Sequence, residues 1–178
     1  MIPVIVVGPT KDVLTYAFLD KSSHTTLVSQ ELIDRLTLTR NLSELRVATI
    51  IGSQVMVALE IRSLDGGETV AVERAYSVPS LRMMPQVNSV QKEVDKWPHL
   101  EGIHFDEVPD KKVSILIGND IFEAYWVLDQ RLGGRKQPYS VKTLLGWIIF
   151  RPLWSYRRKL TAVNCLQVVD MSIAEQIQ

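Results

Sequence analysis

Residues 16–28 are YAFLDKSSHTTLV, and the rest of the chain is interpreted around this stretch. An apolar run ends at Asp20, a short polar turn follows, and the chain becomes apolar again at Leu27. The first run has the pattern of a buried strand, so it places the Asp20 carboxylate at the end of that strand, where solvation is poor. A carboxylate in this setting can share a proton with a neighbouring carboxylate. Asp20 is therefore the first candidate for a catalytic residue.

The composition is that of a globular chain without net charge. An apolar fraction of 46% in 178 residues is enough for one domain with a real core. Lys plus Arg and Asp plus Glu number 20 each, so no net field attracts nucleic acid. We therefore expect no nucleic-acid partner, and a nucleic-acid-binding domain is the least favoured of the functions considered.

Ligands for a metal or a cofactor are not evident in the sequence. Cys165 is the single cysteine, so no disulfide framework or thiolate metal site is expected. The group formed by His99, His104, Asp106 and Glu107 fits no zinc-ligand spacing and is interpreted as a polar loop. We therefore predict no metal and no cofactor.

The start of the chain lacks a basic leader and a signal-peptide core. The most apolar segment, residues 144–154, is interrupted by Arg151 and is too short to cross a membrane. An intracellular, cytoplasmic protein without a membrane partner is the resulting expectation.

Hydrophobic patterning predicts a mainly β domain. Strands are expected at residues 4–7, 13–19, 45–51, 55–62, 70–78, 113–118, 125–130 and 144–150. Ser29 is expected to cap a short helix, and a second short helix is expected near residues 87–96. Residues 79–112 are rich in proline and charge and are predicted to form a surface insertion, and residues 154–178 a linker or tail.

Four short motifs, in this order, give the chain a family resemblance. They are FLDKSS at 18–23, AYSVP at 75–79, ILIGND at 115–120 and TLLGWI at 143–148. With these motifs the chain resembles the retropepsin-like aspartic peptidases, and most closely the peptidase domain of BEL/Pao-type retrotransposon polyproteins. The resemblance covers about residues 2–153. Without the later motifs, Asp20 would be better explained as a turn carboxylate that caps residues 25–28.

The resemblance implies a fold and an active-site loop. The fold is a closed antiparallel β-barrel of the acid-protease type, with one or two short helices, over residues 1–153. Asp20 is the implied catalytic residue, and Lys21, Ser22 and Ser23 complete its loop. Because each chain supplies one such aspartate, the resemblance also implies a homodimer, in which two carboxylates hold one proton and activate a water.

Two further elements are implied by the resemblance. Ile51, Gly52 and Ser53 would form the flap over a polypeptide substrate. Ile117 and Gly118 would end the strand that supports the active-site loop. The implied function is therefore that of an aspartic endopeptidase acting in a retroelement polyprotein.

The active-site loop departs from the family pattern at two positions. The family has Ser or Thr and then Gly after the aspartate, where this chain has Lys21 and Ser22. Lys21 has no hydroxyl to bond across a dimer, and a neighbouring ammonium favours an ionised carboxylate, which opposes proton sharing. Ser22 adds a side chain where glycine lets the backbone approach the carboxylates. The alternative function is a catalytically inactive peptidase fold that serves as a dimerisation or protein-binding module.

Overall fold

The computed structural model describes residues 1–38, 41–43, 54–81, 83 and 90–150. Its strands are β1 (Ile2–Val7), β2 (Val13–Leu19), β3 (Leu27–Ser29), β4 (Asn41–Ser43), β5 (Gln54–Arg62), β6 (Thr69–Val78), β7 (Val113–Ile117), β8 (Asp129–Arg131), β9 (Tyr139–Thr143) and β10 (Gly146–Phe150). Its helices are α1 (Gln30–Leu36) and α2 (Val90–Val94), with 3₁₀ turns η1 (Pro98–Leu100) and η2 (Phe122–Tyr125). The prediction of a mainly β chain with two short helices is confirmed.

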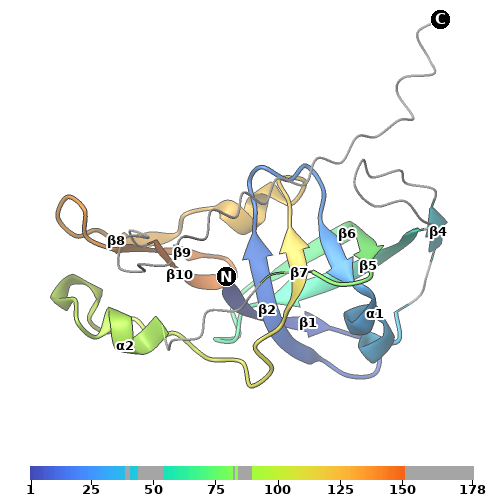
Figure 1. The fold of residues 1–178 in the computed structure, drawn as a ribbon, viewed down its shortest axis with the longest axis horizontal. Coiled ribbons are helices and arrows are strands. Elements are labelled where there is room, and N and C mark those ends of the chain that lie inside the picture. Colours follow the sequence, from blue (N-terminus) through green and yellow to red (C-terminus); the bar gives the residue numbers. More distant parts are fainter. Residues whose placement is uncertain (39–40, 44–53, 82, 84–89, 151–178) are drawn as a thin grey trace, which may run out of the picture.

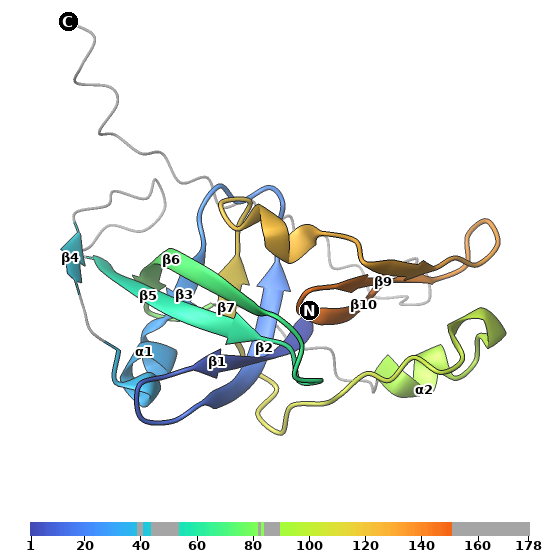
Figure 2. The same cartoon turned by 180° about the vertical axis from the view of Figure 1, so that it is seen from behind.

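Six strands close into a barrel. Their hydrogen-bonded order is β1-β2-β7-β3-β6-β5, and β5 pairs back onto β1 at residues 60–62, while β4 pairs with the same edge of β5 at residues 54–56. Figures 1 and 2 show these strands wrapped around a common interior. The predicted closed barrel is thus confirmed.

The barrel is not antiparallel throughout, which corrects the expectation from the sequence. β2 pairs with β7 in parallel, and so does β3 with β6. For β2 and β7 the reason is that β7 inserts between β2 and β3, which run in opposite directions. A strand in that place must be parallel to one neighbour and antiparallel to the other, and β7 is antiparallel to β3.

The hydrophobic core fills the barrel and extends beneath α1. Alternate residues of β1, beginning with Ile2, point into the interior and are buried, as the two-residue period of a strand requires. The helix α1 adds Leu32, Ile33 and Leu36, which are all buried. α1 ends at Thr37, whose left-handed backbone (φ 56°) stops the helix.

Ser29 caps α1 as the sequence predicted. Its hydroxyl accepts a hydrogen bond from the Leu32 amide at 3.3 Å. We expect Ser29→Ala to lower the free energy of unfolding by about 1 kcal/mol, because a buried amide loses its acceptor. Urea titration followed by circular dichroism measures this, with the exposed Ser80→Ala as the matched control. An equal, near-zero effect of both changes would contradict the cap.

Strands β8, β9 and β10 form a separate antiparallel sheet in the order β10-β9-β8. The sequence predicted two strands here, near residues 125–130 and 144–150, and missed β9. The reason is that β9 is short, half polar, and directly preceded by the turn-forming residues 133–138. Figure 1 shows this sheet beside the barrel, on the same side as α2.

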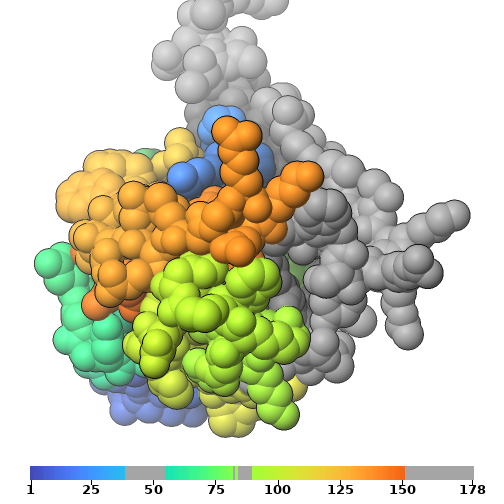
Figure 3. All heavy atoms as spheres, turned by 90° about the vertical axis from the view of Figure 1, so that its left-hand side faces the viewer, coloured from blue at the N-terminus to red at the C-terminus, as the bar shows by residue number. Residues whose placement is uncertain are grey.

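The predicted insertion, residues 79–112, contributes a second small hydrophobic cluster. Its buried members are Val94, Leu100, Ile103 and Phe105, and Trp147 and Ile149 of β10 pack against them. In Figure 3 the atoms of residues 90–105 lie directly against those of the β8–β10 segment. The insertion therefore covers one face of the three-stranded sheet.

Some predictions fall on residues that the structure does not describe. These are the flap (Ile51, Gly52 and Ser53), the whole strand expected at 45–51, and the linker or tail at 154–178. They remain predictions.

Candidate functional site

Asp20 lies at the rim of the barrel, directly after β2. Leu19, the last residue of β2, is paired in register with Ile117, the last residue of β7. The Asp20 amide continues this pairing and donates to the Ile117 carbonyl oxygen at 3.0 Å. Ile117 is fully buried, whereas Asp20 is only partly buried. The predicted supporting strand therefore does lie beside the predicted catalytic residue.

The Asp20 carboxylate is engaged within its own loop by Ser22. Oδ1 of Asp20 accepts hydrogen bonds from the Ser22 amide at 3.0 Å and from the Ser22 hydroxyl at 2.6 Å. The Ser23 amide closes the turn by donating to the Asp20 carbonyl oxygen at 3.2 Å. An amide at this position donates whatever the side chain is, but the hydroxyl bond exists only because residue 22 is serine. Ser22 thus adds a second donor to one carboxylate oxygen.

Lys21 is exposed and lies next to an aromatic ring. Its ammonium nitrogen is 5.3 Å from the centroid of the Tyr125 ring, within the range of a cation–π contact. The Tyr125 hydroxyl donates to the Ile117 carbonyl oxygen at 2.6 Å. Burial, and then the negative charge of Asp20, raise the pKa of the Tyr125 phenol above its ordinary value. Tyr125 is therefore a neutral hydrogen-bond donor that joins η2 to the end of β7.

Sequence reasoning did not identify Tyr125 as part of this site. The residue belongs to η2, which the sequence indicated only as a helical turn, and no spacing rule links it to Asp20. The available signal was its place shortly after the ILIGND motif. The contact between the Tyr125 ring and Lys21 exists only in the folded chain.

The loop that carries Asp20 is joined to the turn after β7 by a network centred on Asp120. Oδ2 of Asp120 accepts the Thr26 amide at 3.0 Å, and Oδ1 accepts the Thr26 hydroxyl at 2.8 Å. The Thr26 oxygen in turn accepts the Gly118 amide at 3.1 Å, and the Asn119 amide donates to the Ser23 carbonyl oxygen at 2.8 Å. Asp120 therefore acts as a structural brace.

Replacing Asp120 tests this brace. Thr26 is fully buried, so in Asp120→Ala its amide and hydroxyl lose their acceptors. We expect the free energy of unfolding to fall by about 2 kcal/mol, because unsatisfied buried polar groups are costly. Chemical denaturation measures the change, and Asp110→Ala is the control, since Asp110 lies in an exposed 4.0 Å ion pair with Arg35. Equal losses in the two variants would contradict the brace.

Among the residues that the structure describes, no second carboxylate is placed to share a proton with Asp20. Asp120 is the acid on the adjoining turn, and both of its oxygens are bound by Thr26. As far as the described residues go, a water-activating pair of carboxylates would therefore need an aspartate from another copy of the chain.

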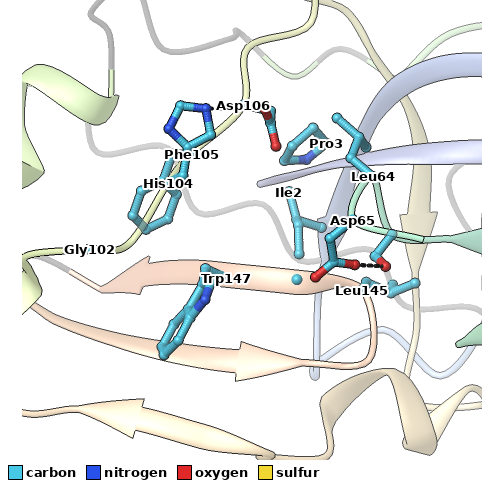
Figure 4. A pocket seen from close by; sticks show the side chains of 12 residues that line it. Ile2, Pro3, Leu64, Asp65, Gly102, His104, Phe105, Asp106, Leu145 and Trp147 are labelled. Carbon is cyan, nitrogen blue, oxygen red and sulfur yellow. Dashed lines mark hydrogen bonds and ion pairs between the residues drawn. The ribbon is translucent and has the colours of Figure 1, made fainter. Parts of the chain in front are cut away.

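A cavity of about 280 Å³ lies elsewhere, between the start of β1, the β5–β6 turn, β10 and the insertion (Figure 4). None of the predicted site residues lines it. The carboxylate of Asp65 at its edge accepts bonds from the Ser63 hydroxyl and the Gly67 amide, and the first of these lowers the pKa of Asp65. Lys142 lies 3.8 Å from the same carboxylate. The Asp65 carboxylate is thus satisfied within the chain.

His99 and His104 belong to the insertion and not to the loop that carries Asp20. Nε2 of His99 is 2.9 Å from the Pro138 carbonyl oxygen, and His104 lies 3.3 Å from Asp106 on the surface. Within the described ranges, no three His, Cys, Asp or Glu side chains are placed to hold a metal ion. In the same part of the chain, no helix is long and apolar enough to cross a membrane.

Comparison with known proteins identified no relative. Protein-family models, curated proteins and solved structures were all searched, and none matches the chain.

Proposed function

We propose that this chain is a retropepsin-like aspartic endopeptidase domain of a retroelement polyprotein, which cleaves polypeptides as a homodimer. The observation that carries the proposal is the position of Asp20. It follows β2, is bonded to the end of β7, and remains partly exposed on a loop that Asp120 holds through Thr26, while Tyr125 bonds the end of β7. A rigid, accessible carboxylate at the rim of a closed barrel is what a two-chain aspartate dyad requires.

The reaction follows from the chemistry of paired carboxylates. Two Asp20 side chains about 3 Å apart hold a single proton, because two negative charges at that distance repel each other. The ionised carboxylate takes a proton from a water, whose oxygen attacks the peptide carbonyl carbon. The protonated carboxyl group then gives its proton to the departing amine. Since Ser22 binds Oδ1, Oδ2 is the oxygen of each Asp20 left for the water or the shared proton.

Peptide cleavage by the purified full chain tests this function. A mixed peptide library is incubated at pH 4–7, with and without a statin-type transition-state mimic, and the products are identified by mass spectrometry. We expect cleavage that the mimic inhibits and that Asp20→Asn reduces to background, since an amide cannot take the proton from water. The rate should rise faster than linearly with protein concentration, because two chains form one site. Cleavage that persists in Asp20→Asn would refute the proposal.

A second candidate function is a catalytically inactive fold that binds a polypeptide or a second copy. The observation that favours it is the Ser22 hydroxyl bonded to Asp20, together with the Lys21 ammonium beside the same loop. The same assay separates the two functions. No cleavage by the wild-type chain, with dimerisation intact, would favour this second function.

A further inference from the structure

The face of the three-stranded sheet away from the insertion carries stacked aromatic rings. Successive residues of a strand point to opposite faces, and residues paired across strands share a face. Trp147 and Ile149 of β10 pack against the insertion, so Phe150 points to the other face. Phe150 is paired with Tyr139 of β9, and their rings stack with the centroids 4.9 Å apart. This second face is therefore apolar where Tyr139 and Phe150 meet.

Leu132 extends the two rings into a row across all three strands. β8 ends at Arg131, which is paired with Ser140, so Leu132 comes opposite Tyr139 in the same register. We call Leu132, Tyr139 and Phe150 the apolar row. Their exposed fractions are 60%, 39% and 44%. Adjoining exposed apolar side chains, unlike scattered single ones, mark a contact surface.

The area of the apolar row indicates what kind of partner it fits. Large aromatic side chains offer roughly 150–250 Å² each, and those of the row are about half exposed, so the row presents on the order of 250 Å². A specific contact between separate chains needs roughly 600 Å² or more from each partner. The chain that follows Phe150 starts from the row itself, and such a tether gives an effective concentration of about millimolar. A later segment of the same chain is therefore the favoured occupant.

Residues 169–173 have the sequence pattern that would cover the row. They are Val-Asp-Met-Ser-Ile, in which apolar and polar residues alternate. In an extended segment this alternation places Val169, Met171 and Ile173 on one face. The three would span about 13 Å, and the row spans about 10 Å across three strands. One apolar face of this segment is thus long enough to cover the whole row.

The charges around the two segments are complementary. Residues 160–178 contain Asp170 and Glu175 but no Lys or Arg. The β8–β9 loop, between Leu132 and Tyr139 in the chain, carries the exposed Arg135 and Lys136. Opposite charges at the border of an apolar contact favour the correct pairing of two surfaces.

We propose that residues 169–173 dock on the apolar row of the same chain through their three alternating apolar side chains. The docked segment covers the stacked Tyr139 and Phe150 rings, and it leaves the backbone edge of β8 and the pair of Asp129 with Arg131 as they are. The inference goes beyond the proposed function, because it concerns the three-stranded sheet and no residue of the Asp20 loop.

Disulfide trapping in the full chain tests this docking. Cys165 is the single cysteine, so Cys165→Ser removes the native thiol. Adding Leu132→Cys and Met171→Cys then places one thiol on each side of the proposed contact. We expect oxidation of this parent variant at low protein concentration to give an intrachain disulfide, identified by mass spectrometry of the linked peptides.

Two substitutions in this parent variant separate docking from chance encounters of two tethered thiols. Ile173→Asp places a charge in the contact and should slow disulfide formation at least about tenfold, because burying an unpaired charge is costly. Ser172→Asp adds the same charge on the face that points away from the row. It is the matched control and should leave the rate unchanged. Thermal melting shows that the variants remain folded.

Three results would overturn the proposal. The first is that the parent variant forms no intrachain disulfide. The second is that Ile173→Asp and Ser172→Asp form it at equal rates. The third is that the disulfides join different chains, which a mixture of isotope-labelled and unlabelled protein reveals, because a second copy would then occupy the row. None of these readouts depends on peptide cleavage, so the proposed function can fail while this docking stands.

Discussion

Gly118→Ala is expected to lower the free energy of unfolding by about 3 kcal/mol, among the largest effects of any single substitution in this chain. A Cβ at position 118 would lie 2.7 Å from both the carbonyl carbon and the oxygen of Thr25, and 2.8 Å from Oδ1 of Asp120. These distances are too short for non-bonded atoms. The Thr25 atoms belong to the backbone, so they cannot rotate away as a side chain would.

The surrounding hydrogen bonds prevent an easy relaxation. The Gly118 amide donates to the Thr26 hydroxyl oxygen, and Asn119 is bonded to the Ser23 carbonyl oxygen. Separating the two segments to admit a methyl group would stretch these bonds. Gly134→Ala is the control, because its Cβ would meet its nearest neighbour, Oε1 of Gln137, at an ordinary 3.4 Å. Urea unfolding that shows the same midpoint for the two variants would contradict the close approach at Gly118.

Lys21→Ser/Ser22→Gly is expected to raise kcat/KM for peptide cleavage by about 100-fold or more, which corresponds to about 2.7 kcal/mol of transition-state stabilisation. Removing the Ser22 hydroxyl takes away one of the two donors on Oδ1 of Asp20. In the proposed dimer, it also removes a side chain from the place where the two Asp20 carboxylates would approach each other. Serine at position 21 supplies a hydroxyl without the charge of Lys21.

The two single variants show which substitution causes the rise in kcat/KM. Ser22→Gly alone should act through the freed carboxylate oxygen, and Lys21→Ser alone through the loss of the cation. The double variant combined with Asp20→Asn is the control and should cleave nothing. Initial rates over a range of protein concentrations measure the effect. If the double variant is folded and dimeric but cleaves no faster than the wild type, Ser22 and Lys21 do not limit catalysis.

The strands around Asp20 were predictable because their signals are local. The apolar run of β2 and the continuous apolar run of β7 before Gly118 each identify a strand without reference to any other part of the chain, and β7 is fully buried whereas β2 is half-buried. The Ser29 cap is likewise contained within four residues. The position of Asp20 after β2 follows from the same local pattern.

The pairings that complete the site were not predictable in this way. The parallel contact of β2 with β7 depends on where β7 enters the barrel, and no local pattern encodes that. The bond between Thr26 and Asp120 joins residues 94 positions apart. Both residues occur in many turns, so neither type alone indicates this partnership. The Tyr125 ring is positioned by η2, whose short 3₁₀ form has no strong sequence signal.

The insertion of β7 between β2 and β3 has a consequence for the order of folding. The strand that supports the Asp20 loop ends at residue 117, and the brace comes from residue 120, so the loop stays unsupported until this much of the chain exists. Contacts between such distant segments form slowly, because a long loop must first be closed. During synthesis the chain would pass through a stage with β1 and β2 paired and the place of β7 empty. The Asp20 loop is therefore assembled late, and its maturation is tied to completion of the barrel.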